Sequence, residues 1–397
     1  MRLFRKKNTS VIGEKKDIPL ILIMLLHMFF ANSNLNIVQI LLEVILLTLF
    51  IVRLRHKTFS FHEISIFHFF IFGSCISFLM NPIEIFLINF KIFGLAILTL
   101  IYFSKVHIRP DVIGIVFLVN LFFIFQQVFW GEHLASPIIR EIGGYFGSEV
   151  YMNARPLGVF MNTHQSSFFM ALCLIYYGLK NRLYGVGIIA LYYSGSFFTL
   201  VSYIAQLVKN NKIWQLIPRV LYKILMSAFL LFLFVIIVIM LNAAFLVETL
   251  ASYDFDFLHG LFPAHRIHGI QVIIQQVFDH DLLVKLLSIY PLDSNTIVEG
   301  REAMGLMGNE VAYFRYIFQS GIILFALYFI YLLKRIKYFR AFLIVSLLHY
   351  GDLVTPLIIF MMITFSRTVE TSKSSVMLPA PLSQSSPWTH RIGPLKV

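Results

Sequence analysis

The chain is dominated by apolar segments, each close to the roughly 20 residues that an α-helix needs to cross a lipid bilayer. Of its 397 residues, 58% are hydrophobic and only 13% are charged, whereas a soluble domain carries about 25% charged residues. We therefore expect an all-α fold. It would be a polytopic integral membrane helical bundle of about 11–12 transmembrane helices, with a large periplasmic or extracellular loop containing short amphipathic helices.

Polar turns and short basic clusters separate the apolar segments and set the limits of the predicted spans. Spans 1 to 6 are expected over about residues 18–31, 35–52, 64–80, 83–103, 112–129 and 164–179. The segment 183–208 is broken at Ser194-Gly195-Ser196 and is expected to form two short spans, 7 and 8, or one broken pair. Spans 9 and 10 are expected over about 220–245 and 311–333. The segment 341–365, interrupted at Tyr350-Gly351-Asp352, is expected to form a last hairpin, spans 11 and 12.

The Lys and Arg residues lie mostly in short clusters that fall on one side of this topology. The clusters include Arg53, Arg55 and Lys57, then Lys105 and Arg109, Lys180 and Arg182, Lys209 and Lys212, and Lys334, Arg335, Lys337 and Arg340. Cytoplasmic loops carry an excess of Lys and Arg, so the formal net charge of +12 indicates membrane orientation, and no nucleic-acid partner is expected. The even number of spans predicts that both termini are cytoplasmic.

Two polar loops, at about 131–163 and 246–310, lie on the opposite, outer side of the predicted topology. The longer loop is expected to carry the chemistry. Residues 1–365 would form one transmembrane domain, and 366–397, rich in Ser and Pro, would form a disordered cytoplasmic tail. Cys75 and Cys173 both lie inside predicted spans, so neither a disulfide nor a metal site is expected.

Arg266, in the longer loop, is the first candidate for a functional residue. It follows Pro263 and opens an apolar pattern at helical spacing, which predicts an amphipathic helix at the membrane surface. An arginine at a helix N-terminus adds a planar, two-pronged donor to free backbone N–H groups, an arrangement that suits a phosphate or diphosphate. The alternative is an interface arginine that binds lipid headgroups or a neighbouring carboxylate.

Arg155 opens a second candidate segment, Arg155-Pro156-Leu157-Gly158-Val159-Phe160-Met161-Asn162-Thr163-His164, just before span 6. Its Pro and Gly predict a turn at the outer surface. Asn162 and His164 would then enter the top of the bundle, where polar groups are costly unless they are paired or functional. The alternative is that Asn162 or Thr163 serves only as the N-cap of the next helix.

Asn309 and Glu310 lead into span 10, with Arg315 one to two turns further in. Partial burial would favour Glu310 as a general base. Alternatively, Glu310 and Arg315 would form a structural ion pair near the interface. Weaker candidates for contacts with an anionic substrate are Arg140, His265, His268 and Arg301.

Ionisable residues also fall inside predicted spans, where they are functional hypotheses by default. They are His27, Glu43, His68, Lys91 and Asp352. Some would pair, for instance His27 with Glu43. A proton-coupled transporter would use such residues, so they favour the main rival class. No nucleotide-binding loop, zinc-binding His pattern or paired-Cys motif is found, and no metal or cofactor is expected.

Three of these pieces resemble the superfamily of bacterial O-antigen polymerases (Wzy-type) and O-antigen ligases. The segment from Arg155 to Asn162 resembles the family's Arg-x-x-Gly-x-Phe-x-Asn segment that leads into a span. Arg266 and the amphipathic run after it are similar to the family's loop arginine and its following helix. The third piece is Asn309-Glu310-Val311-Ala312-Tyr313 followed by Gly321-Ile322, similar to the family's end of loop and next span.

The chain departs from the ligases at two places. Ligases carry a His near the end of the loop, where this chain has Met307-Gly308-Asn309-Glu310. The Gly-x-Gly expected after the amphipathic helix is replaced by Lys285-Leu286-Leu287-Ser288. Both departures favour a polymerase, whose family members diverge more freely.

The resemblance implies a metal-independent glycosyltransferase that polymerises a polysaccharide of O-antigen or capsule type. It would join polyprenyl-diphosphate-linked oligosaccharide repeat units on the outer face of the bacterial cytoplasmic (inner) membrane. Arg266 and Arg155 would stabilise the leaving diphosphate, and Glu310 would act as the base. The residues that would bind substrate are Arg140, Arg301, Arg315, His268, His164, Asn162 and Asn309.

The expected partners are the lipid-linked oligosaccharide and membrane lipid, with a chain-length regulator and a flippase as candidate protein partners. Two other functions remain open from the sequence. One is an O-antigen ligase, which moves a finished glycan onto a lipid core. The other is a flippase or other transporter of lipid-linked oligosaccharides.

Overall fold

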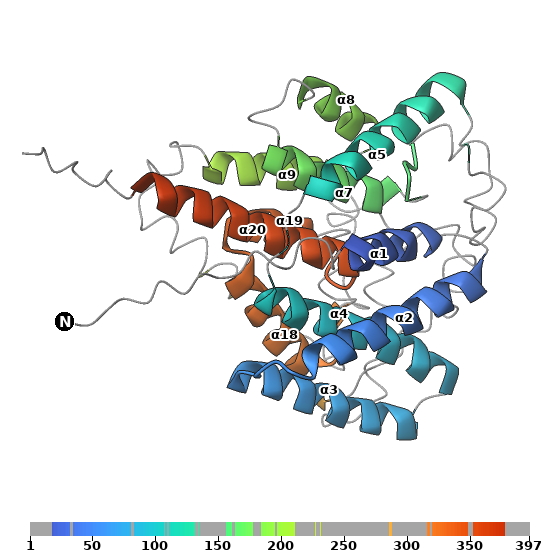
Figure 1. Ribbon diagram of the computed structural model, residues 1–397, viewed down its shortest axis with the longest axis vertical. Helices are drawn as coiled ribbons and strands as arrows, with labels where there is room; N and C mark the ends of the chain where they lie inside the picture. The colour runs from blue at the N-terminus through green and yellow to red at the C-terminus, as the bar shows by residue number, and fades with distance from the viewer. Residues whose placement is uncertain are drawn as a thin grey trace, which may run out of the picture.

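A computed structural model describes a large part of the chain, and every regular element in that part is helical. The described residues are 18–31, 35–80, 83–106, 108, 111–131, 134, 156–160, 163–177, 184–194, 197–210, 227, 231, 286–287, 316–317, 320–347 and 352–377. The expected all-α class is thereby confirmed for these residues (Figure 1). Most of span 9, nearly all of the loop 246–310 and both chain ends lie outside the described residues.

The helices agree closely with the predicted limits of the first eight spans. The first six are α1 (Ile18–Phe30), α2 (Asn36–Leu54), α3 (Phe61–Met80), α4 (Ile83–Lys105), α5 (Asp111–Trp130) and α7 (Thr163–Tyr177). The predicted break of the segment 183–208 is confirmed, because α8 (Tyr184–Ser194) and α9 (Phe197–Asn210) are separate helices. The remaining elements are α18 (Ile322–Arg335), η3 (Lys337–Phe339), α19 (Arg340–Ser346) and α20 (Pro356–Met377).

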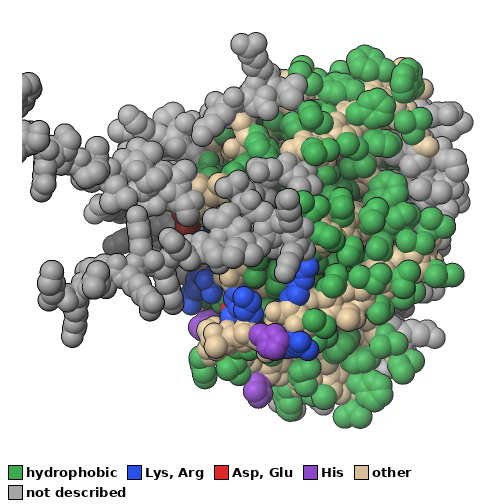
Figure 2. Space-filling view, in the orientation of Figure 1, with side chains coloured by type: hydrophobic (Ala, Val, Ile, Leu, Met, Phe, Trp, Pro, Cys, Tyr) green, Lys and Arg blue, Asp and Glu red, His purple; other side chains and the backbone are tan. Residues whose placement is uncertain are grey.

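Three of the described helical stretches are long and apolar enough to cross a membrane: Asn36–Leu54, Phe61–Met80 and Ile113–Trp130. They belong to α2, α3 and α5, and α1 is a shorter apolar helix. Several of their large apolar side chains are more than half exposed, including Ile37, Phe61 and Leu79. The face shown in Figure 2 is accordingly hydrophobic over most of its described area. Such continuous apolar surface is typical of contact with lipid.

Helix α20 lies at the centre of the bundle, in contact with α1, α4, α7 and η3 (Figure 1). All its residues from 356 to 366 are buried, as is typical of a helix that is apolar on every side. The Phe365 ring stacks on the Tyr176 ring of α7 with centroids 4.0 Å apart. The Phe360 ring lies 4.7 Å from the Phe103 ring of α4.

The described basic clusters gather at one end of the bundle, as the topology predicts. The Lys105 ammonium at the end of α4 donates to the carbonyl of Thr58 in the α2–α3 turn at 2.6 Å. The Lys209 ammonium at the end of α9 donates to the Lys337 carbonyl at 3.1 Å. Arg367 of α20 donates to the carbonyls of Ser104 and Val106, beside the end of α4. We call this side the basic end.

The predicted span 10 is not one continuous helix. Ser320 is helical, but Gly321 interrupts the helix with φ of 78° before α18 begins. Glycine adopts such a φ without steric cost. The Ser320 hydroxyl donates to the Tyr316 carbonyl at 2.7 Å, which satisfies a carbonyl of the turn before the break.

The last hairpin is shorter than two full spans. Helix α19 has 7 residues, about 10 Å of rise, whereas the hydrocarbon core of a bilayer is about 30 Å thick. The backbone directly before α20, residues 352–355, contacts the inside of the bundle: the Tyr328 hydroxyl, near the middle of α18, donates to the Leu353 carbonyl at 2.5 Å. The Gln206 side chain of α9 supports the start of α19, because its Oε1 accepts from the Phe342 N–H at 3.0 Å.

The boundary predicted at residue 366 for a disordered tail falls inside a helix. Helix α20 continues to Met377, because Arg367 finds carbonyl partners on the α4 side and Thr368 donates to the Thr364 carbonyl at 2.9 Å. The rest of the predicted tail, 378–397, lies outside the described residues.

Asp352, one of the ionisable residues predicted inside the spans, has a structural role in the turn that leads into α20. Its Oδ1 accepts from the N–H groups of Val354 and Thr355 at 3.1 and 2.9 Å. A carboxylate at this place satisfies backbone donors that precede the helix and interacts favourably with its dipole. The side chain is 9% exposed, so water does not replace it readily.

We expect Asp352→Ala to lower the free energy of unfolding by about 1–2 kcal/mol, because two largely buried backbone N–H groups lose their acceptor. Asp352→Asn is the matched control, because it keeps the side-chain oxygen and should stay close to wild type. Thermal unfolding of the purified protein in detergent measures both. Equal losses in the two variants would show that the charge, and not the hydrogen-bond acceptor, matters at this position.

Candidate functional site

The predicted site residues fall almost entirely outside the described part of the chain. Those outside it are Arg140, Arg155, Asn162, Arg266, His268, Arg301, Asn309, Glu310 and Arg315. His164 is described, in the first turn of α7. The structure does describe the residues that directly follow two of the arginines, Pro156 after Arg155 and Tyr316 after Arg315. These two surroundings are the described parts of the chain that directly adjoin predicted site residues in the sequence.

The turn 156–160, which follows Arg155, is held by two buried amide side chains of α5. The Leu157 N–H donates to Gln127 Oε1 at 2.8 Å, and the Val159 N–H donates to Asn120 Oδ1 at 2.9 Å. Asn120 and Gln127 are both buried. A backbone outside a helix has no internal partners for its N–H groups, and inside a membrane protein other groups must supply them. The two amides do so here.

Gly158 makes this turn possible. Its φ is +63°, in the left-handed region. A Cβ at this position would lie 2.5 Å from the Ser166 hydroxyl and closer still to Asn120 Oδ1. The Ser166 hydroxyl donates to the Leu157 carbonyl at 2.5 Å, so it is fixed in place. The glycine of the Arg-x-x-Gly pattern is therefore required both by backbone conformation and by space.

The turn lies deeper than the sequence predicts. We expected it at the outer surface, but Val159 bonds to Asn120, which is near the middle of α5. The reason is that Asn120, Gln127 and Ser166 satisfy the turn's polar backbone groups inside the bundle, so they do not need water. The chain beside Arg155 thus reaches into the bundle.

Below the turn, small polar side chains form a buried seam between α7 and α9. The Ser167 hydroxyl donates to the His164 carbonyl at 3.0 Å and lies 3.5 Å from the Thr199 hydroxyl. Ser202 of α9 is fully buried as well. His164, predicted to bind substrate, is partly buried at the top of this seam.

Asn120 and Gln127 were not among the residues predicted from the sequence. A signal was present, because both are amides inside an otherwise apolar helix, where polar groups are costly unless they have partners. Inside the predicted spans, however, only ionisable side chains were considered as functional candidates. Gln126 beside them also has a role, because its Oε1 accepts from the Leu134 N–H at 3.3 Å.

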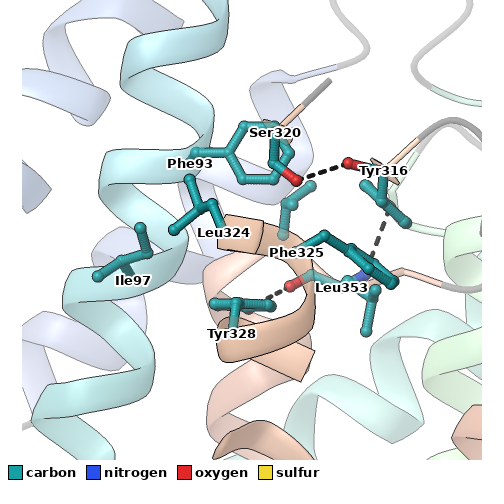
Figure 3. A pocket seen from close by; sticks show the side chains of 9 residues that line it. Phe93, Ile97, Tyr316, Ser320, Leu324, Phe325, Tyr328 and Leu353 are labelled. Atoms are coloured by element: carbon teal, nitrogen blue, oxygen red, sulfur yellow. Dashed lines mark hydrogen bonds between the residues drawn. The ribbon is translucent and has the colours of Figure 1, made fainter. Parts of the chain in front are cut away.

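Tyr316, which follows Arg315, is anchored on the turn before α20 (Figure 3). Its hydroxyl accepts from the Leu353 N–H at 3.3 Å, and its side chain is buried. Phe93 and Ile97 of α4 pack against the same group, and the space that these residues enclose is too small for a water molecule. The group is therefore a packed anchor for the chain next to Arg315, and it leaves no room for a ligand.

A second polar cluster joins α1, α2 and α4 inside the bundle. The predicted pair is confirmed, because His27 Nε2 lies 3.6 Å from Glu43 Oε1. The Lys91 ammonium lies 2.8 Å from Glu43 Oε2, and the Gln39 amide donates to Glu43 Oε1 at 2.9 Å. His27 and Glu43 are buried. His68 is not part of this cluster; its side chain is exposed, with Nδ1 3.3 Å from the Ile64 carbonyl.

An apolar groove of about 320 Å³ lies between the halves of α3 and α4 that are remote from the basic end. Its lining residues are Ile71, Ser74, Cys75, Phe78, Leu79, Phe86 and Phe90. The aromatic rings pack edge to face or tilted, with the Phe78 and Phe86 centroids 5.3 Å apart. A groove of this composition can hold a hydrocarbon chain but offers a polar ligand few partners, the Ser74 hydroxyl and the weakly donating Cys75 thiol.

No protein-family model, curated protein or solved structure matches this chain. Within the residues that the structure describes, no three His, Cys, Asp or Glu side chains are grouped so as to hold a metal ion. The function is therefore inferred from the turn beside Arg155, the buried seam, the charged cluster and the apolar groove themselves.

We expect Gly158→Ala to lower the free energy of unfolding by about 2–4 kcal/mol, because it adds backbone strain and steric overlap with Asn120 and Ser166. Gly131→Ala is the matched control: Gly131 has a φ of +78°, but a methyl group added there would meet no atom within 4 Å. Gly131→Ala should lower the free energy of unfolding only by the cost of the strained backbone, about 1–2 kcal/mol. Urea or thermal unfolding in detergent compares them, and equal losses would contradict the tight fit at Gly158.

Proposed function

We propose that this protein is a membrane glycosyltransferase that joins polyprenyl-diphosphate-linked oligosaccharide repeat units into a polysaccharide. The reaction would take place on the outer face of the bacterial cytoplasmic membrane. The observation that carries the proposal is the turn 156–160, whose backbone is fixed inside the bundle by Asn120 and Gln127 directly after Arg155. Non-helical backbone at membrane depth is tolerated where it is buried in protein or lines a cavity, and such places recur at substrate sites.

The chemistry follows from the leaving group. A hydroxyl of the acceptor sugar attacks the anomeric carbon of the donor glycan, a new glycosidic bond forms, and the bond from that carbon to the diphosphate oxygen breaks. The polyprenyl diphosphate leaves with the bonding electron pair. The hydroxyl proton passes to a base, for which Glu310 is the candidate. Arg155 and Arg266 would neutralise charge on the leaving diphosphate, and stabilisation of this kind is commonly the largest contribution to catalysis.

The apolar groove between α3 and α4 supports this proposal, because the substrate is a lipid. The groove lies in the halves of α3 and α4 away from the basic end, which is the side on which the proposed reaction occurs. A polyprenyl chain could lie along Phe78, Phe86 and Phe90 while its diphosphate reaches the arginines. Burial of a hydrocarbon chain against such rings is favourable by roughly 25 cal/mol per Å² of apolar surface.

We expect Arg155→Ala and Arg266→Ala each to lower the rate of glycan elongation by about a hundredfold, because a donor to the developing negative charge is lost. The measurement is elongation of lipid-linked repeat units by the purified protein in detergent, where no membrane gradient exists. Arg55→Ala, which removes the same charge from the basic end, is the control and should retain the wild-type rate. If both site variants keep wild-type polymer length, the assignment of these arginines is wrong.

The ligase alternative is separated from the polymerase by a gene deletion. Loss of a polymerase leaves single repeat units attached to the core, whereas loss of a ligase removes every glycan from it. The departures at Asn309-Glu310 and at Lys285-Leu286 favour the first outcome.

A transporter of lipid-linked oligosaccharides is the second candidate, and the cluster of His27, Glu43 and Lys91 favours it specifically. Three ionisable groups from three helices meet inside the bundle, and such groups mark proton relays in transporters. They also have a structural use here, since they connect α1 to α2 and α4. The polymerase proposal assigns the cluster this connecting role.

We expect Glu43→Gln to destabilise the protein by about 1–3 kcal/mol, because it leaves the Lys91 charge without its carboxylate; partial exposure of Lys91 limits the loss. The double variant Glu43→Gln with Lys91→Met should regain much of this stability and keep its elongation rate in detergent. Thermal unfolding and the elongation assay are the measurements. Purified wild-type protein that does not elongate, together with a folded double variant that abolishes glycan export in cells, would favour the transporter.

A further inference from the structure

A compact group of nitrogen-bearing side chains lies at the basic end, where the proposed glycan chemistry has no use for it. It consists of His62 in the first turn of α3 and Lys334 and Arg335 in the last turn of α18, arranged around the Tyr331 ring. Figure 2 shows Lys, Arg and His side chains gathered in one area at the lower left of the described surface, while hydrophobic side chains cover most of the remainder. We call these four residues the α3–α18 cluster.

The geometry of the α3–α18 cluster brings two cationic side chains, Lys334 and Arg335, close to the imidazole of His62. The Lys334 ammonium lies 3.5 Å from His62 Nε2. The His62 ring stacks on the Tyr331 ring with centroids 6.5 Å apart. The Arg335 guanidinium lies 4.8 Å from the Tyr331 ring centroid, and its Nη2 donates to the Tyr331 hydroxyl at 2.8 Å. The tyrosine thus holds an arginine and a histidine on one small area of surface.

The neighbouring carboxylate, Glu63, does not neutralise this surface. Glu63 is 1% exposed, and its oxygens face inward. They accept from the Lys105 ammonium at 2.7 Å, the Tyr331 hydroxyl at 2.5 Å and the Ser60 N–H at 2.7 Å. Its charge is therefore balanced by Lys105, and Lys334 remains as an exposed cation on the outside of the cluster.

The charged surface adjoins an apolar one. Ile330 lies one turn before Lys334 on α18, so the two side chains share a face, and Ile330 is 47% exposed. Phe61, next to His62, is 82% exposed, and Ile64 in the same turn is 44% exposed. A ligand here meets cations at one end and hydrocarbon directly beside them, the distribution found in a phospholipid.

We propose that the α3–α18 cluster binds the phosphate headgroup of an anionic phospholipid in the leaflet at the basic end. Lys334, His62 and Arg335 would contact the phosphate, and the acyl chains would lie along Ile330 and Ile64. A soluble phosphate would use the same cations but not the apolar side chains, which is why we assign the site to a lipid. The leaflet that faces basic clusters is the one rich in anionic lipid in cells.

The test uses the purified full-length protein in detergent, titrated separately with phosphatidylglycerol, phosphatidylcholine and inorganic phosphate while its melting temperature is measured. We expect phosphatidylglycerol to raise the melting temperature and the other two to have little effect. Lys334→Ala should weaken the apparent affinity for phosphatidylglycerol about fivefold, as expected for one lost cation near an anionic headgroup. His62→Ala should weaken it as well, because the imidazole that holds the Lys334 ammonium in place is lost. Lys334→Arg should restore it.

Lys57→Ala is the matched control, because Lys57 is an exposed cation at the same end of the bundle, outside the cluster. It should keep wild-type affinity. The proposal is overturned if phosphatidylcholine or inorganic phosphate stabilises the protein as much as phosphatidylglycerol does. It is also overturned if Lys57→Ala weakens binding as much as Lys334→Ala, because the effect would then be one of diffuse charge.

Discussion

The structure depends on hydrogen bonds to backbone N–H and C=O groups wherever the chain leaves a helix inside an apolar bundle. Within the described residues, side-chain amides do this repeatedly. Asn120 and Gln127 of α5 bind the turn 156–160, and Gln206 of α9 binds both the Phe342 N–H and the Tyr338 carbonyl at the start of α19. An unpaired N–H in such surroundings costs several kcal/mol. These amides therefore decide where irregular segments can enter the bundle and hence where a site can form.

Helix limits could be predicted from the sequence, because each is marked locally by a change from apolar to polar residues or by a turn signal. The break at Ser194-Gly195-Ser196 is of this kind. The interruption at Gly321 was missed, because a single glycine in an apolar run carries no sign of its φ. The length of α20 was missed for a different reason: Arg367 is kept in the helix by carbonyls more than 250 residues earlier in the chain.

In the candidate site, too, some features could be predicted from the sequence and others could not. The Pro and Gly after Arg155 predict a turn, and the structure has one, but its depth is set by Asn120, which lies 39 residues before Val159. The pair of His27 with Glu43 could be proposed because both are ionisable groups in neighbouring spans. Lys91 joins them from α4, and only the packing of α4 against α2 reveals that the carboxylate has a cationic partner. A single sequence does not show which of its distant segments are in contact.

The central position of α20 has a consequence for biosynthesis. Its residues 356–366 are buried on every side by helices that precede it in the chain, and domains are made from the N-terminus onward. Helices α1, α4 and α7 are therefore translated and inserted before the element that fills the space among them exists. Until α20 is inserted, the apolar faces that it covers on these helices must be covered by lipid or by one another, so the final packing of the bundle forms only after α20 is in place.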